Sequence, residues 1–241
     1  MTFPNLDRIS GIHNYCDSWC ERCAFTTRCA VYAVEVATQM FDGDHEAAAA
    51  LVLSPRPPMT AEEERRREEL FEAMNNSEPT DAEVAEYRRQ EEARTERIEE
   101  SPAITASVQA ALLMDAWLDA HEEAGVQRDP HTTQALDVVR WDRHLIPVKL
   151  RRALRGLDEY TRDEDFEDDP VQNDWNGTAK VTLISIRRSI EAWNTLAEAL
   201  SDPEAKAIAE ELRELHRQVL RTFPDADRFI RPGFDQAAAQ G

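Results

Sequence analysis

The residues of this sequence most able to do chemistry are its cysteines. All four lie within fourteen residues near the start of the 241-residue chain, at Cys16, Cys20, Cys23 and Cys29. Thiols confined to one short segment are typical of a metal-ligand set rather than of scattered packing residues. At about 3.6 residues per turn, a helix would bring the first three cysteines to one face. Cys29 lies beyond a Thr-Thr pair and could fold back to supply a fourth sulfur.

Three kinds of thiol chemistry compete for this segment. A [4Fe–4S] cluster needs four thiolates that converge on a compact segment, and this segment offers four. A structural zinc site usually takes two separated knuckles, whereas here one knuckle, Cys20–Cys23, has a single thiol on either side. Disulfides belong to oxidising compartments, and residues 1–13 have neither the basic start nor the apolar run of a signal peptide. We therefore expect a [4Fe–4S] cluster, with zinc as the alternative and reduced thiols or disulfides after it.

Two family resemblances lie within residues 16–29. The spacing Cys16-x3-Cys20-x2-Cys23 resembles the radical SAM motif, but that family needs a barrel of alternating strands and helices, and this sequence shows almost no strand pattern. The run from Cys20 to Cys29 is similar to the Cys-x2-Cys-x5-Cys iron–sulfur segment of RecB-like nucleases, including an aromatic residue, Phe25, inside the loop. This resemblance implies iron–sulfur binding and not nuclease activity, because no nuclease core of strand-borne acidic residues and lysine accompanies it. Cys16 would be the fourth ligand, which those enzymes take from far away in sequence.

The side chains around the cysteines are compatible with such a cluster. Arg22 and Arg28 are close enough in sequence to offset the negative charge of four thiolates. Tyr15, Trp19 and Phe25 would either shield the sulfurs from water or seat the segment on the helices below it.

Composition narrows the partners and the compartment. The chain carries 48 acidic and 28 basic residues, a formal net charge of −20, which repels phosphate backbones and anionic lipid. Nucleic acid and membrane surfaces are therefore not expected as partners, whereas a basic protein or a redox partner is compatible with this charge. No apolar run approaches the roughly 18 residues of a membrane span, and we expect a cytoplasmic protein. The oligomeric state is left open.

Helix signals recur along the chain, while seven glycines and few β-branched runs argue against a sheet-rich fold. We expect an all-α fold, a bundle of about five to seven helices with the metal-binding cysteine segment at its N-terminus. The expected organisation is one helical domain over residues 1–225 and a flexible tail over 226–241. The domain would contain a cysteine segment (1–30), a charged helical hairpin or arm (59–100) and a core bundle (101–222).

Local signals predict where these helices begin and end. Thr60–Glu63 and Thr80–Glu83 read as capping boxes that open the two helices of the charged arm. Ser101 before Pro102, and Asp202 before Pro203, each place a capping residue ahead of a proline at the first helical position. The remaining expected helices and breaks are helices over 30–40, 44–53, 101–125, 132–156 and 177–200, a proline-rich break at 54–58, an interruption at Pro147 and an acidic loop over 158–176.

A second candidate site comes from charges beside the apolar stripes of the core helices. Its residues are Asp142, His144, Lys149, Lys180, Arg187 and Glu191. If their helix faces met, they would line a pocket for a small anionic ligand, in which Asp142 or Glu191 could move protons. The competing interpretation is structural, with Asp142 pairing with Lys149 and Arg187 with Glu191. A di-iron bundle is excluded because its Glu-x-x-His pairs are missing.

Three functions remain in order. The first is a metal-binding helical protein with a four-cysteine [4Fe–4S] cluster that has an electron-transfer, redox-sensing or structural role. The second is a zinc-stapled helical interaction module, and the third is a helical enzyme or small-molecule binder with a charged pocket. Whether the protein is an enzyme is not decided by the sequence, since no nucleophile arrangement, phosphate loop or dinucleotide motif appears.

Overall fold

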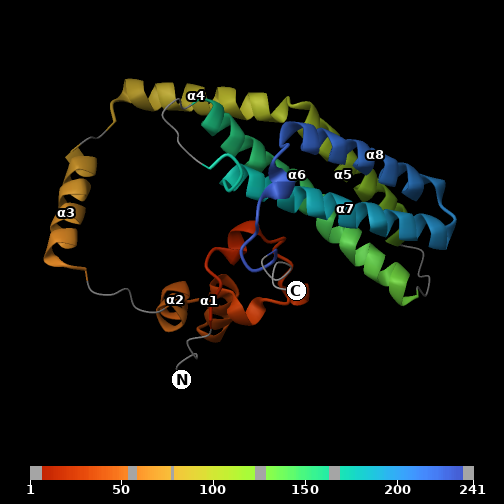
Figure 1. The fold of residues 1–241 in the computed structure, drawn as a ribbon, viewed down its shortest axis with the longest axis horizontal. Helices are drawn as coiled ribbons and strands as arrows, with labels where there is room; N and C mark the ends of the chain where they lie inside the picture. The colour runs from red at the N-terminus through yellow and green to blue at the C-terminus, as the bar shows by residue number, and fades with distance from the viewer. Residues whose placement is uncertain (1–6, 54–58, 77–78, 123–128, 163–168, 236–241) are drawn as a thin grey trace. The chain divides into compact units, whose positions relative to one another are not determined.

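Helices account for all the regular structure that can be described. The computed structural model describes residues 7–53, 59–76, 79–122, 129–162 and 169–235 (Figure 1). Within these ranges the chain forms eight α-helices and four short 3-10 helices, with no strand. The all-α prediction is confirmed. The expected number of about five to seven helices was too low, because the short helices near the N-terminus and both helices of the charged arm all form.

The chain divides into two compact units. The first, here the N-terminal unit, comprises Met1–His13 and Ser18–Ala93. The second, here the bundle unit, comprises Asn14–Asp17 and Arg94–Gly241. The four-residue segment Asn14–Asp17, which we call the strap, therefore belongs with the C-terminal helices and not with its sequence neighbours.

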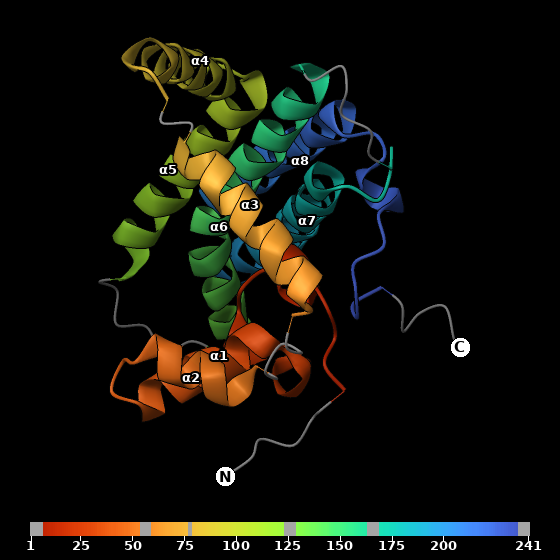
Figure 2. The same cartoon turned by 90° about the vertical axis from the view of Figure 1, so that its left-hand side faces the viewer.

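The N-terminal unit has a small core of its own. Its helices are α1 (Ala30–Met40), α2 (His45–Val52), α3 (Ala61–Asn76) and most of α4 (Asp81–Glu99), as Figure 2 shows. Helices α1 and α2 bury a cluster formed by Val34, Ala37, Ala48 and Val52. The 3-10 helices η2 (Cys20–Arg22) and η3 (Thr26–Arg28) precede α1, and η1 (Ile12–Tyr15) crosses from this unit into the strap.

Both predicted capping boxes of the charged arm are present. The Thr60 hydroxyl accepts the amide N–H of Glu63 at 3.3 Å, and the Glu63 carboxylate accepts the amide N–H of Thr60 at 2.7 Å. Thr80 and Glu83 repeat these two hydrogen bonds at the same lengths. Between these caps α3 exposes every side chain that is described, Leu70 and Phe71 included. This helix is therefore stabilised by its local sequence and not by burial.

The bundle unit is built from four long helices. They are α5 (Pro102–Glu122), α6 (Pro130–Arg162), α7 (Asp174–Leu200) and α8 (Pro203–Thr222), which lie side by side in both views (Figures 1 and 2). Helix α7 packs against α6 and α8, and α5 also contacts both of those helices. The largest fully buried side chains come from all four helices and from the residue after α8, and they include Ile104, Met114, Ile146, Leu150, Trp193, Leu212 and Phe223.

Several predicted boundaries in this unit were wrong. Helix α6 continues through Pro147 and Gly156 to Arg162, so it enters the segment expected to be an acidic loop. Pro147 is buried between Ile146 and Leu150 on the packed side of the helix, and tertiary packing outweighs the hydrogen bond that the proline removes. Helix α7 begins at Asp174, because the Asn173 side chain accepts the amide N–H of Asn176. The stop expected at Gly125 lies outside the described residues.

The described part of the expected tail, residues 226–235, packs on the bundle unit. It contains the 3-10 helix η4 (Ala226–Arg228), which contacts α7. Ala226 and Phe229 are buried, and Phe229 packs its ring against Tyr15 of the strap at a centroid distance of 4.6 Å.

Gly177 allows this packing. A β-carbon built at Gly177 would lie 2.5 Å from Tyr15 Cδ1 and 2.7 Å from Phe229 Cζ, well inside van der Waals contact. In an ordinary helix interior, replacing Gly by Ala stabilises by about 1 kcal/mol. Here the two rings would have to move, so the usual sign should reverse.

We predict that Gly177→Ala lowers the free energy of unfolding by about 1–3 kcal/mol, the usual cost of overpacking a filled site. Urea denaturation of the full chain measures this. In a Tyr15→Ala background the same substitution should cost less, because one of the obstructing rings is gone. A stabilising Gly177→Ala in the wild-type background would show that the glycine is not required for close approach.

Candidate functional site

The four cysteines are distributed over both units. Cys20 opens η2, Cys23 follows it, and Cys29 immediately precedes α1, all in the N-terminal unit. Cys16 lies in the strap and belongs to the bundle unit. All four are free thiols with partly exposed side chains.

The helical arrangement expected for the first three cysteines is wrong. Residues 17–19 are not helical, and Ser18 has φ of 58°, in the left-handed region. Cys16 and Cys20 are therefore separated by a non-helical connection. Within the described ranges, no three His, Cys, Asp or Glu side chains are grouped as they would be around a metal ion. The four-cysteine ligand set thus remains a prediction, and thiolate sites commonly assemble only with their metal.

The turn between Cys20 and Cys23 has the features of a thiolate-binding knuckle. The amide N–H of Cys23 donates to the Cys20 carbonyl at 3.2 Å, which closes the turn. The amide N–H of Phe25 donates to Cys23 Sγ at 3.4 Å. Hydrogen bonds from backbone amides to sulfur stabilise a thiolate and tune the potential of a cluster that it binds. Cys29 lies at the N-terminus of α1, where the helix dipole favours negative charge.

The two arginines of the cysteine segment have other contacts in the structure. Arg28 donates to the backbone oxygen and to the carboxylate of Asp7, both at 2.8 Å. Arg22 places its guanidinium 4.0 Å from the centroid of the Trp19 ring. Both contacts hold the local conformation of the segment between residues 7 and 28.

The strap is held on the bundle unit at both of its ends. Tyr15 packs on Gly177 and Phe229, as described above. Two residues later, the Asp17 carbonyl accepts a hydrogen bond from Trp141 Nε1 at 3.0 Å. The Asp17 carboxylate also accepts from Arg188 Nη1 at 2.5 Å. Cys16 is thereby placed between two anchored residues on the surface formed by α6 and α7.

Arg188 joins this strap to a fully buried carboxylate. Its Nε and Nη2 atoms donate to the two oxygens of Asp142, at 3.1 and 2.5 Å, in the bidentate geometry typical of arginine–carboxylate pairs. Asp142 is 0% exposed and is carried by α6. One guanidinium therefore serves two carboxylates, and the group of three carries a net negative charge when both are ionised.

Burial changes the protonation of this group. The loss of solvent around Asp142 raises its pKa to about 6, and the charge of Asp17 acts in the same direction while Arg188 opposes both. Lys149 lies seven residues further along α6 and is also buried. Burial lowers the pKa of its ammonium group, and the negative charges of Cys16 and Asp17 oppose that change.

Sequence reasoning found Asp142 and Lys149 but missed Arg188. The expected pairing of Asp142 with Lys149 is replaced by Asp142 with Arg188. A signal for Arg188 was available, because it continues a second stripe of buried α7 residues formed by Val181, Ser185 and Ala192. An arginine within such a stripe is expected to have a carboxylate partner.

The other four candidate pocket residues lie elsewhere. Lys180 forms an ion pair with Asp235 at 2.9 Å and donates to the Phe229 carbonyl at 2.5 Å. Arg187 is exposed and pairs with Asp227 at 3.4 Å, not with Glu191 as the structural interpretation expected. Lys180 and Arg187 therefore both hold the segment after α8. His144 and Glu191 are exposed on α6 and α7.

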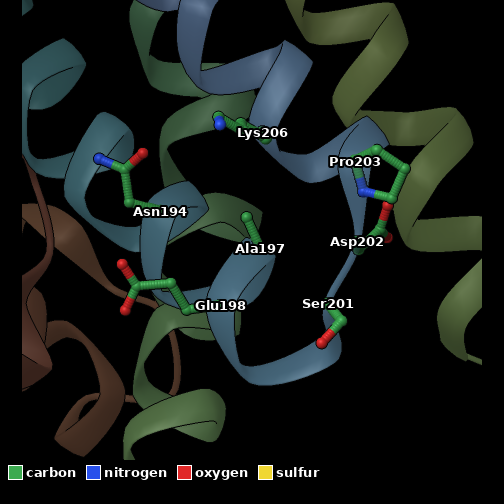
Figure 3. A pocket seen from close by; sticks show the side chains of 7 residues that line it. All are labelled: Asn194, Ala197, Glu198, Ser201, Asp202, Pro203 and Lys206. Carbon is green, nitrogen blue, oxygen red and sulfur yellow. The ribbon is translucent and has the colours of Figure 1, made fainter.

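A cavity of about 350 Å³ lies at the turn between α7 and α8 (Figure 3). Its lining consists of Asn194, Ala197, Glu198, Ser201, Asp202, Pro203 and Lys206. None of the six candidate pocket residues is among them. Asp202 already accepts from Trp117 Nε1 at 2.6 Å and caps α8 through the amides of Glu204 and Ala205. The most polar part of this lining therefore has a structural role.

Comparison with known proteins provides no relative from which a role could be transferred. No protein-family model, no curated protein and no solved structure matches the chain. Among the helices in the described part of the chain, none is long and apolar enough to cross a membrane.

The buried carboxylate generates a prediction about pH. In the unfolded chain Asp142 has a pKa of 3.8, and in the folded protein it is about 6, so the folded state binds the proton more tightly between these values. The contribution of this group to stability is therefore complete below about pH 4 and is lost as the pH rises through about 6.

We predict that the free energy of unfolding of the wild type, relative to Asp142→Asn, falls by on the order of 3 kcal/mol between pH 3.5 and 7. Asparagine keeps the size of the side chain and cannot titrate. Denaturant unfolding of both proteins across this range measures the difference. Parallel stability curves would mean that the pKa of Asp142 is the same in the folded and unfolded chains.

Proposed function

We propose that this chain is a helical metalloprotein that binds a [4Fe–4S] cluster through Cys16, Cys20, Cys23 and Cys29. The observation that carries the proposal is the confinement of every cysteine of the chain to fourteen residues. All four are free, partly exposed thiols, as a ligand set must be before its cofactor binds.

Local geometry supports three of the ligands. Cys20 and Cys23 flank a hydrogen-bonded turn, and Cys23 accepts a backbone N–H at its sulfur. Cys29 precedes a helix whose N-terminal amides favour an anion. For Cys16 the support is chain length, because four residues span at most about 14 Å when extended and so keep Cys16 within reach of Cys20.

The ligand count limits what such a cluster could do. Four protein thiolates leave no iron with an open coordination position, so the cluster would not bind substrate. Electron transfer, redox sensing or stabilisation of the fold are the roles compatible with a fully ligated cluster. An acidic chain of net charge −20 would meet a redox partner most readily through a basic surface on that partner.

The same thiolates could instead hold zinc, and this is the second candidate. The hydrogen-bonded turn between Cys20 and Cys23 is equally suited to a tetrahedral zinc ligand pair. The protein would then be a zinc-stapled helical interaction module. Helix α3, whose described side chains are all exposed and mostly charged, would be the surface that recruits a basic protein.

A charged-pocket enzyme or small-molecule binder gains no comparable support. The six residues suggested for that pocket take part in separate contacts or lie exposed on different helices.

We predict about four iron and four sulfide per chain after anaerobic purification, with visible absorption and no stoichiometric zinc. Serine at any one of the four cysteine positions should lower the bound iron by more than half, because a hydroxyl is a poor substitute for a thiolate. Thr27→Ser is the matched control, since it changes an exposed side chain within the same segment and leaves all four thiols.

Two outcomes would count against the cluster. About one zinc per colourless chain would replace it with the zinc module. Protein with neither metal, even after anaerobic reconstitution with iron and sulfide, would overturn the metalloprotein proposal altogether.

A further inference from the structure

Lys149 is a buried cation whose position is not explained by the fold. It is 9% exposed on the packed side of α6. Among the residues that the structure describes, it forms no hydrogen bond and no ion pair within 4.0 Å, in contrast to Lys180 and Arg188. Burying a charged ammonium group without a partner costs several kcal/mol. Such a residue indicates that an anion belongs beside it.

The strap places Cys16 next to this lysine. Asp142 and Lys149 are seven residues apart on α6, which puts them on the same helix face about 10 Å apart along the axis. The strap is attached to this surface by Asp17 at Arg188 and Asp142, and by Tyr15 at Gly177. Cys16 lies between those attachments. Of the charged groups near Lys149, the thiolate of Cys16 has the largest effect on it.

The other acidic groups near Lys149 already have cationic partners. Asp17 pairs with Arg188, and Asp174 pairs with Arg152 at 2.9 Å. Arg152 itself repels Lys149. The negative charge that Lys149 can compensate is therefore the one that develops at Cys16.

We propose that Lys149 is the charge-compensating residue of the cysteine centre, with its ammonium group stabilising the anionic thiolate-bound cofactor on the side of Cys16. The inference rests on the proposed function. Four thiolates give a net charge of about −2 to an oxidised [4Fe–4S] cluster and to a zinc ion alike. One-electron reduction of the cluster adds a further negative charge. A fixed cation beside one sulfur favours the reduced form and raises the reduction potential.

The test compares Lys149→Met with Lys149→Arg in the full chain, purified anaerobically with its cofactor. Methionine fills a similar volume without the charge, and arginine keeps the charge. Lys206→Met is the matched control, because it removes an exposed lysine from α8 of the same unit. Equilibrium redox titration followed by visible absorption measures the potential of each variant.

We predict that Lys149→Met makes reduction less favourable by about tenfold in its equilibrium constant, equivalent to 59 mV for one electron. Lys149→Arg and Lys206→Met should stay close to the wild type. If the wild type holds zinc, the readout is zinc affinity in competition with a chelator, and Lys149→Met alone should lower it by about tenfold.

The outcomes separate this inference from the proposal on which it rests. A wild type without metal refutes the metalloprotein proposal. A metal-loaded Lys149→Met whose potential or zinc affinity equals that of the wild type refutes the role of Lys149 and leaves the metalloprotein proposal standing. Urea unfolding of the metal-free proteins provides the folding check, and removal of an unpaired buried charge should not lower stability. If Lys149→Met does not fold, Lys149→Gln undergoes the same measurements.

Discussion

The guanidinium of Arg188 is the interaction on which the charged interior of the bundle unit depends. It donates to both oxygens of a carboxylate that has no solvent exposure and, from its third nitrogen, to Asp17 of the strap. A buried carboxylate without this partner would cost several kcal/mol. The pair therefore requires that α6 and α7 keep one relative register, and it holds the strap on the surface that the two helices form.

Small and aromatic residues complete what the charges begin. Gly177 leaves room for Tyr15, and Phe229 covers it, so that a segment from near the start of the chain and one from near its end meet on α7. Cys16 is carried by the strap and shares its position, next to Lys149. The chemistry proposed for the cysteines and the packing of the bundle unit thus meet at a single residue, because the neighbours of Cys16 on either side are structural anchors.

The sequence predicted the helices well wherever a local signal opened them. Thr60, Thr80 and Asp202 cap helices as expected, because capping is a contact within four residues and needs no tertiary partner. Boundaries that depend on packing were predicted badly. Helix α6 passes Pro147 and Gly156, and Gly156 packs closely on Trp175, a contact that no local pattern reveals. The helix expected to group three cysteines is absent, since Ser18 takes a left-handed conformation between them.

By itself the sequence determined the composition of the candidate site: four thiols, one Cys-x2-Cys knuckle and a chain of helices to carry them. It also identified Asp142 and Lys149 as unusual, because periodicity shows which face of a helix a residue occupies. Only the tertiary structure decided which charges meet. Arg188 lies 46 residues from Asp142 and 171 from Asp17. Their contact depends on the rotation and register of two packed helices and on a strap that crosses them. These follow from the packing of the whole unit, and a local sequence pattern contains no record of them.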